Sequence, residues 1–233
     1  MTTLGLFGCK QATGTTTLAV ALASVLDTDG GAVVLECDPQ GGDLSAMLGR
    51  PPVPGLMSAA AAGRHGGHVD IGAHVQALPA GGLVLLAPSE PTQVVASLSQ
   101  VGARLSDLAG SLAEHVIVDH GRGVEPVGRH DVGLVLCHPT VAGVEQARVR
   151  CEALDDQGVD ALIVLSANGP YRSAEVAGAL GRSVIATIPA DGRGVAGLLE
   201  GRRSAMRSPL VRAAASVVAE VSASRPGREL ARG

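Results

Sequence analysis

The chain has 233 residues, of which 46% are hydrophobic and 17% are charged, and its formal net charge is −4. This composition is typical of a globular protein with a buried core, and the length allows one large domain. The sequence has no apolar run of about 18 residues, which excludes a membrane-spanning helix, and no basic segment ahead of an apolar one at its start, which argues against a signal peptide. We therefore expect a cytoplasmic protein.

Short runs rich in leucine or β-branched residues recur along the chain, separated by segments with helical spacing. We expect strands at 3–8, 32–36, 82–88, 115–119, 132–137, 161–166 and 183–189. Strands that alternate with helices in this way are typical of an α/β protein with a mostly parallel sheet. Because Phe7 and Tyr171 are the only bulky aromatic residues, aliphatic side chains must pack the core.

The helical pattern is clearest over 91–109, where apolar residues return at three- and four-residue spacing behind Pro91. The Gly- and Pro-rich stretch 49–56 and the segment after it predict a loop with short helices between the second and third strands. Residues 209–221 are expected to pack against the sheet as the last helix. We take 1–222 as a single domain and 223–233, which lacks apolar periodicity, as a mobile tail.

The cysteines and histidines show no metal-binding spacing. Cys9, Cys37 and Cys137 fall at expected strand ends, where cysteine usually serves as a small buried hydrophobe. His65 and His68 stand in a glycine-rich loop, where histidines without partners are usually exposed to solvent, so we do not expect a metal site there.

The stretch GCKQATGTTTLA, residues 8–19, follows the first strand and opens a helix. It resembles the phosphate-binding pattern G-x-x-x-x-G-K-[ST], but Thr15 stands where the lysine should follow Gly14. The only lysine of the chain, Lys10, lies four residues ahead of that glycine. The N–H groups of 11–16 can cradle phosphate oxygens at the start of a helix.

Two further loops place acidic residues at the carboxyl edge of the sheet, where ligands bind in open parallel sheets. Thr16 takes the position that binds Mg²⁺, and Asp119 ends an apolar strand as a Walker B carboxylate does. Asp38 could orient an attacking water, and Gly121 leaves room and an N–H for a terminal phosphate. A lone aspartate at a strand end also serves as a turn or cap residue, but three such loops in order favour a nucleotide site.

These segments resemble the MinD/ParA family of P-loop ATPases, whose deviant Walker A loop reads K-G-G-x-G-K-[ST]-[ST]. The matching positions here are Lys10, Gln11, Ala12, Thr13, Gly14, Thr15, Thr16 and Thr17. Segment 33–49 is similar to the family's D-x-D-P-Q-G region, 115–123 to its Walker B and switch region, and 186–201 to its late strand, turn and helix. Within the family, GDLSAMLG at 42–49, GLVLLAPSEP at 82–91 and GTTTLA at 14–19 look most like the CpaE/TadZ-type branch associated with pilus assembly.

The resemblance implies a three-layer α/β P-loop NTPase fold, with about seven to eight strands in a twisted sheet and helices on both faces. It implies ATP and Mg²⁺ as cofactors, with the loop 10–17, Gly121, Pro189 and Asp191 at the nucleotide. In such proteins the signature lysine, here Lys10, reaches across a homodimer to the partner's phosphates. Gln11 and Ala12 replace two of the family's glycines, which favours weak binding and weak or absent hydrolysis.

A second departure concerns the residue that reads the adenine. The family's asparagine is expected directly after the sixth strand, where this chain has Ser166, and Asn168 comes two residues later.

Three functions remain open from the sequence. The first is an ATP-controlled dimer that places a pilus or secretion machine, and the second is a scaffold of the same fold that ignores nucleotide. The third is a DNA-partition ATPase, because residues 190–233 carry a net charge of +4 and leave −8 for the rest. Membrane binding through the last helix is not expected, because that segment has no bulky aromatic residues.

Overall fold

The computed structural model describes residues 1–9, 14–64, 69–123, 125–166 and 169–224. Its eight-stranded sheet has the order β3-β4-β2-β5-β1-β6-β7-β8. Every neighbouring pair is parallel except β3 with β4 at one edge. The strands are β1 Thr2–Gly8, β2 Ala32–Glu36, β3 Gln76–Ala77, β4 Leu83–Leu85, β5 His115–Asp119, β6 Val132–Cys137, β7 Ala161–Ser166 and β8 Val184–Ile188.

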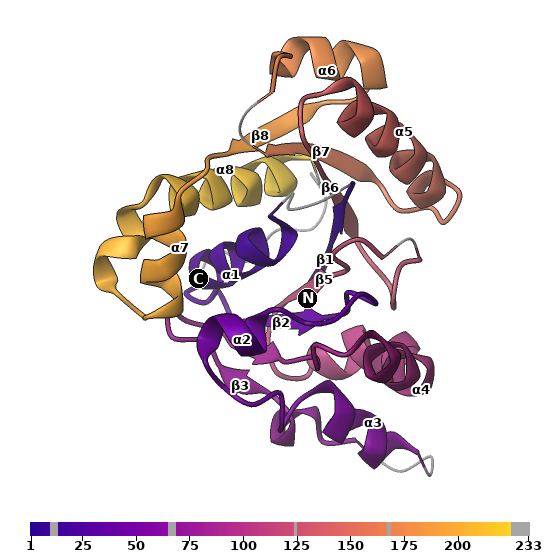
Figure 1. Cartoon of the computed structure of the whole chain (residues 1–233), viewed down its shortest axis with the longest axis vertical. Coiled ribbons are helices and arrows are strands. Elements are labelled where there is room, and N and C mark those ends of the chain that lie inside the picture. The colour runs from indigo at the N-terminus through magenta and orange to yellow at the C-terminus, as the bar shows by residue number, and fades with distance from the viewer. Residues whose placement is uncertain (10–13, 65–68, 124, 167–168, 225–233) are drawn as a thin grey trace.

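Helices cover both faces of this sheet, as Figure 1 shows. One face packs on α1 (Thr15–Leu26), α7 (Gly192–Leu199) and α8 (Pro209–Ala223). The other face packs on α3 (Leu56–Gly63) and α4 (Pro91–Ala109) over β2, β4 and β5, and on α5 (Val141–Asp155) and α6 (Ser173–Leu180) over β6 and β7. The remaining elements are α2 (Leu44–Leu48) and the 3-10 turns Ile71–Ala73 and Arg203–Arg207. The three-layer α/β architecture is therefore confirmed.

The core is aliphatic, as the composition requires. Leu6, Leu22 and Leu136 are fully buried on the α1 side, and Phe7 is fully buried on the α5 side. All four cysteines are buried and reduced, which agrees with their interpretation as small hydrophobes.

Most expected elements lie where the sequence places them. All seven expected strands and the helix over 91–109 are present, and the last helix continues to Ala223 and packs on α1 and β8. Two differences concern the edge of the sheet. The strand expected at 82–88 ends at Leu85, because the carbonyl of Leu86 accepts from the N–H of Leu56, the first residue of α3. The short antiparallel β3 was not expected. Within the described residues, no helix combines the length and apolarity needed to cross a membrane.

Three aromatic rings pack together where β1 meets the loop after β5. The ring of Phe7 stacks on that of His120 at 4.4 Å between centroids, and His130 meets both rings edge-on. The Nε2 atoms of His120 and His130 lie 2.9 Å apart, so one imidazole donates to the other. This arrangement requires at least one neutral ring. Burial lowers the pKa of His120 and brings the pKa of His130 from 6.5 to about 4.

Acid should therefore destabilise the fold through His130. The unfolded imidazole takes up a proton near pH 6.5 and the folded one only near pH 4, so its contribution is intact above pH 6.5 and is lost as the pH falls toward 4. Between pH 7 and pH 5 we expect a loss of about 1–2 kcal/mol from this residue. Urea denaturation of wild type and His130→Asn at both pH values measures it.

The effect of His130 must be measured as the difference between wild type and variant. Glu36 and Asp119 have raised pKa values, so through them a fall in pH increases the free energy of unfolding, opposite to the effect of His130. His130→Asn should be less stable than wild type at pH 7, with a gap that shrinks at pH 5. A gap that stays constant over this range would contradict the assignment.

Candidate nucleotide-binding site

Three loops meet at the carboxyl edge of the sheet, because β2, β5 and β1 are neighbours. In the strand register, Asp119 lies opposite Leu6 of β1 on one side and Glu36 of β2 on the other. The end of β1 therefore lies beside the acidic ends of β5 and β2. Lys10, Gln11, Ala12 and Thr13 lie outside the described residues, as does Asn168.

The N-terminus of α1 lies at this edge. Gly14 precedes it with φ +85°, a left-handed conformation that favours glycine, and a glycine has no side chain with which to cap the helix. The first turn contains no acidic residue. The first N–H groups of a helix attract anions, and phosphate is the usual ligand at such a terminus. The geometry of 14–17 thus suits a phosphate.

The carboxylate of Asp119 is the centre of the site. Its Oδ2 accepts from the Thr16 hydroxyl at 2.6 Å, and its Oδ1 accepts from the N–H of Gly121 at 2.9 Å. The hydroxyl of Thr15, a buried residue, also lies close enough to lower its pKa. Burial outweighs these contacts and raises the pKa of Asp119 to about 6. These hydrogen bonds do not fully compensate for the burial of the Asp119 charge, so a bound cation would stabilise the ionised carboxylate.

Thr16 and Asp119 fit a magnesium ion. Both supply hard oxygen atoms, and both lie at the start of the helix that would hold the phosphates. The residue that replaces the P-loop lysine, Thr15, is 7% exposed and interacts with Asp119.

Asp38 lies against the loop after β5. Its Oδ1 accepts from the N–H of Gln40 at 2.8 Å, and its Oδ2 accepts from the N–H of Arg122 at 3.3 Å. Burial raises its pKa, and these two contacts partly offset the effect. A Cβ at Gly121 would come within 1.8 Å of the Asp38 carboxylate, so that carboxylate fills the space beside the glycine.

The role expected for Gly121 changes in detail. Its N–H donates to Asp119, and the room beside its Cα is taken by Asp38. A phosphate can accept from the N–H of Gly121 only if the hydrogen bond from that N–H to Asp119 breaks. A cation bound to the Asp119 carboxylate would favour this exchange.

Glu36 is a structural residue that sequence reasoning did not assign. It is 2% exposed, and its Oε1 accepts from the N–H groups of Asp43 and Leu44 while its Oε2 accepts from that of Ala87. The pKa of Glu36 is raised to about 7, because burial outweighs these bonds. The available signal in the sequence was an acidic residue that ends an apolar run, a few residues ahead of the glycine pair Gly41 and Gly42.

The segment expected near the adenine follows β8. Asp191 accepts from the N–H of Gly194 at 2.8 Å and from that of Leu210 at 3.2 Å, so it joins the starts of α7 and α8. Pro189 is half-buried just ahead of it. Ser166, at the end of β7, bonds the carbonyl of Cys137 and Nδ1 of His138. The structure thus brings Pro189 and Asp191 to the same edge of the sheet as the other candidate residues.

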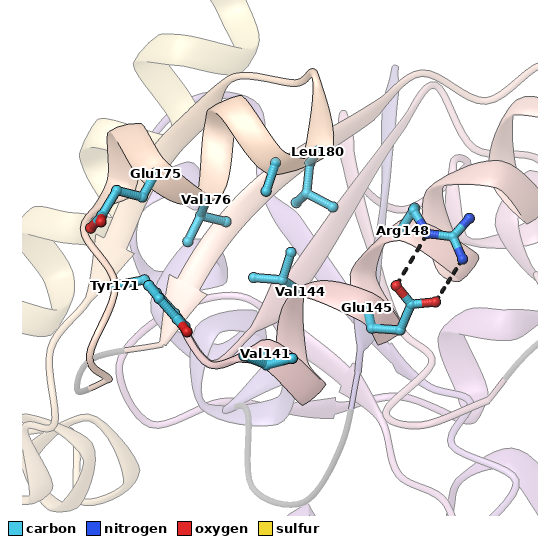
Figure 2. Close-up of a pocket in the computed structure, with 9 residues that line it drawn as sticks. Val141, Val144, Glu145, Arg148, Tyr171, Glu175, Val176 and Leu180 are labelled. Atoms are coloured by element: carbon cyan, nitrogen blue, oxygen red, sulfur yellow. Dashed lines mark hydrogen bonds and ion pairs between the residues drawn. The ribbon is translucent and has the colours of Figure 1, made fainter.

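A separate groove of about 480 Å³ lies between α5 and α6. Figure 2 shows Val144 of α5 facing Val176 and Leu180 of α6, with Val141 and Tyr171 at one end. Its walls are mostly apolar, so it does not suit a phosphate.

Comparison with known proteins places the fold. No protein-family model and no curated protein sequence matches the chain. The ParA family ATPase of Chlorobium tepidum TLS has a TM-score of 0.76 at 19% identity, over 91% of this chain and 95% of that one. A chain of the MinC:MinD cell division protein complex of Aquifex aeolicus has 0.77 at 14%, over 98% and 99%. The septum site-determining protein MinD of Pyrococcus horikoshii OT3, complexed with Mg-ADP, has 0.71 at 16%, over 94% and 95%. The chain therefore has the fold of the MinD and ParA ATPases.

Gly121→Ala tests the contact with Asp38. The new Cβ must displace the carboxylate and also adopt φ +51°, so we expect a loss of about 2–3 kcal/mol in the free energy of unfolding. In an Asp38→Ala background only the backbone strain remains, and the same substitution should cost about 1 kcal/mol. Urea denaturation of the four chains gives the coupling. Equal costs in the two backgrounds would show that the two residues do not touch.

Proposed function

We propose that this chain is a MinD/ParA-like ATP-binding positioning protein that dimerises with ATP and Mg²⁺ in the cytoplasm. The observation that carries the proposal is the pairing of Thr16 with the buried Asp119 beside the uncapped start of α1. Hard oxygen ligands next to a phosphate-binding helix end are the parts that a Mg²⁺-nucleotide needs. The ion would neutralise phosphate charge there, and Asp38 would orient water.

The structural neighbours support this choice. One is complexed with Mg-ADP, and another belongs to a complex of MinD with MinC. A ParA-like protein that binds nucleotide and recruits a partner is thus consistent with the fold.

The P-loop of this chain is degenerate. Without a lysine at Thr15, one charge-assisted contact is lost, at a cost of about 1.5–3 kcal/mol or roughly ten- to a hundredfold in affinity. In the proposed mechanism, Lys10 of each subunit supplies charge to the partner's phosphates. We expect slow hydrolysis or none, with hydrolysis resetting the dimer.

The cargo that we propose is a pilus or secretion machine. This choice rests on the likeness of 42–49 and 82–91 to the CpaE/TadZ-type branch. The first segment forms α2, and the second forms β4 with its flanking turns. The carboxylate of Glu36 accepts hydrogen bonds from both segments, at the N–H groups of Leu44 and Ala87, beside the candidate site. Nucleotide binding could therefore alter the surface that a partner meets there.

The first experiment measures molar mass by light scattering with and without millimolar ATP and Mg²⁺. Wild type should change from monomer to dimer, and Lys10→Ala should stay monomeric because it removes the contact made across the interface. Lys10→Arg keeps the charge and serves as the matched control, which should recover part of the response. Thr16→Ala should respond only at higher Mg²⁺, because Asp119 alone then holds the ion.

Either of two results would reject this function. If the Lys10→Ala chain dimerises normally with ATP, the proposed contact of Lys10 with the partner's phosphates is wrong. A wild-type chain of constant mass, whether monomer or dimer, would instead favour a nucleotide-independent pseudo-ATPase scaffold.

A second candidate function is DNA partition, which an arginine cluster favours. Five exposed arginines gather on α7, the 3-10 turn after it and α8: Arg193, Arg202, Arg203, Arg207 and Arg212. Two of them, Arg193 and Arg202, line a cavity of about 540 Å³, and Arg202 also pairs with Glu200. Such a surface can meet DNA phosphates.

Fluorescence anisotropy with labelled duplex DNA, in the presence of ATP and Mg²⁺, tests this candidate. If three arginines contact phosphates, raising salt from about 50 to about 200 mM should weaken binding roughly 40-fold. Arg203→Gln with Arg207→Gln should reduce both the affinity and its salt dependence. Absent binding, or binding insensitive to salt, would exclude it.

A further inference from the structure

The side chain of Arg150 reaches from α5 to two loops of the candidate site. Its Nη1 donates to the carbonyl of Gly123, and its Nη2 donates to the carbonyls of Gly8 at 3.2 Å and Arg122 at 3.3 Å. Gly8 is the last residue of β1, from which the phosphate-binding loop departs. Arg122 and Gly123 follow β5, three and four residues after Asp119. One guanidinium thus joins the end of β1 to the loop after β5.

The loop after β5 forms a turn that is held from two sides. The N–H of Gly123 donates to the carbonyl of His120 at 2.7 Å, which closes the turn. On one side the N–H of Arg122 donates to Asp38, and on the other the carbonyl of Arg122 accepts from Arg150. Gly121, inside this turn, directs its N–H to Asp119. The N–H of Gly8 also donates to the carbonyl of Gly121 at 2.6 Å, so Arg150 holds the Arg122–Gly123 end of a turn whose other end is bonded directly to β1.

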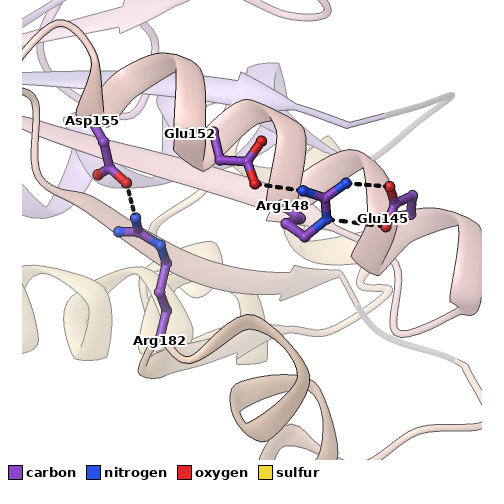
Figure 3. Close-up of polar contacts among 5 residues, drawn as sticks. All are labelled: Glu145, Arg148, Glu152, Asp155 and Arg182. Carbon is purple, nitrogen blue, oxygen red and sulfur yellow. Dashed lines mark hydrogen bonds and ion pairs between the residues drawn. The ribbon is translucent and has the colours of Figure 1, made fainter.

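The charge of Arg150 has no acidic partner among the described residues. Besides the three carbonyls, the guanidinium carbon lies 6.0 Å from the centre of the Phe7 ring, at the outer limit for a cation–π contact. Arginine keeps its charge at all relevant pH values. An anion bound beside the end of β1 would feel this charge, since no carboxylate in the part of the chain that the structure describes neutralises it. This distinguishes Arg150 from Arg148, two residues away, which pairs with Glu145 and Glu152 on the exposed face of α5 (Figure 3).

We propose that Arg150 is a positioning residue that ties the turn 120–123 to the end of β1, so that a nucleoside triphosphate bound with Mg²⁺ at Thr16 and Asp119 tightens the turn. The inference rests on the proposed function. In the absence of nucleotide, Arg150 anchors the turn through the carbonyls of Arg122 and Gly123. When Mg²⁺ and the phosphates bind at Asp119 and Gly121, the turn closes on them, and Arg150 holds the far end of the turn against Gly8 of β1.

Trypsin reports the anchor directly, because it cleaves the peptide bond whose carbonyl Arg150 binds, between Arg122 and Gly123. The described part of the connection 120–131 contains no helix or strand, so a local opening is enough for cleavage. Cleavage after Arg122 would be followed by mass spectrometry for wild type, Arg150→Met, Arg150→Lys and Arg148→Met. Cleavage after other arginines in the same samples reports global unfolding.

Without nucleotide, Arg150→Met should be cleaved after Arg122 roughly tenfold faster than wild type, since the open turn is more populated. Arg150→Lys keeps the charge but presents its donors from a single nitrogen and lacks the planar fork of the guanidinium, so its rate should be intermediate. Arg148→Met, the matched control, should match wild type. Millimolar ATP with Mg²⁺ should slow cleavage in wild type and leave Arg150→Met unchanged, and ADP should protect less.

Two results overturn the coupling. One is cleavage of Arg150→Met after Arg122 at the wild-type rate, or faster only in step with all other sites. The other is equal protection of wild type and Arg150→Met by ATP. A wild-type chain that neither nucleotide protects rejects the proposed function instead, and the nucleotide-free rates then still decide whether Arg150 anchors the turn.

Discussion

The buried carboxylate of Asp119 is the interaction on which the candidate site depends. It stands at the end of a central strand, and it joins the start of α1 through Thr16 to the turn after β5 through Gly121. Burial of this acid is costly, as its raised pKa shows. The hydrogen bonds offset part of that cost only when both loops are in place. The acid therefore sets the relative position of the two loops before any ligand arrives.

Glu36, its neighbour in the strand register, shows why two buried acids can have different roles. All three partners of Glu36 are main-chain N–H groups, at the start of α2 and after β4, and they cannot leave without undoing those elements. The strongest partner of Asp119 is a hydroxyl that can rotate toward a cation. Glu36 is thus committed to the fold, whereas Asp119 can exchange a contact for a ligand.

The sequence predicts the layers well because apolar runs and helical periodicity are local signals. It could not predict β3, which has two residues and no pattern. Nor could it predict the early end of β4, which depends on a hydrogen bond from the N–H of Leu56 to the carbonyl of Leu86, thirty residues later in the chain. It places Thr16, Asp38 and Asp119 at one edge through a motif. It could not show that Asp38 fills the space beside Gly121, or that Arg150 contacts Gly8, because these contacts join residues distant in sequence and carry no motif.

The missing lysine at Thr15 has a thermodynamic consequence for the proposed switch. Besides Mg²⁺, the phosphates would meet three sources of positive charge: the start of α1, the guanidinium of Arg150 at Gly8, and Lys10 from a partner. Only the last arrives with dimerisation. When a contact within the subunit is lost, the contact across the interface supplies a larger share of the binding free energy, and by linkage ATP then favours the dimer as strongly as the dimer favours ATP. A monomer would hold ATP poorly, so the nucleotide-bound protein and the dimer become nearly the same state. For a positioning protein this is useful, because the lifetime of the dimer then equals the lifetime of its bound triphosphate.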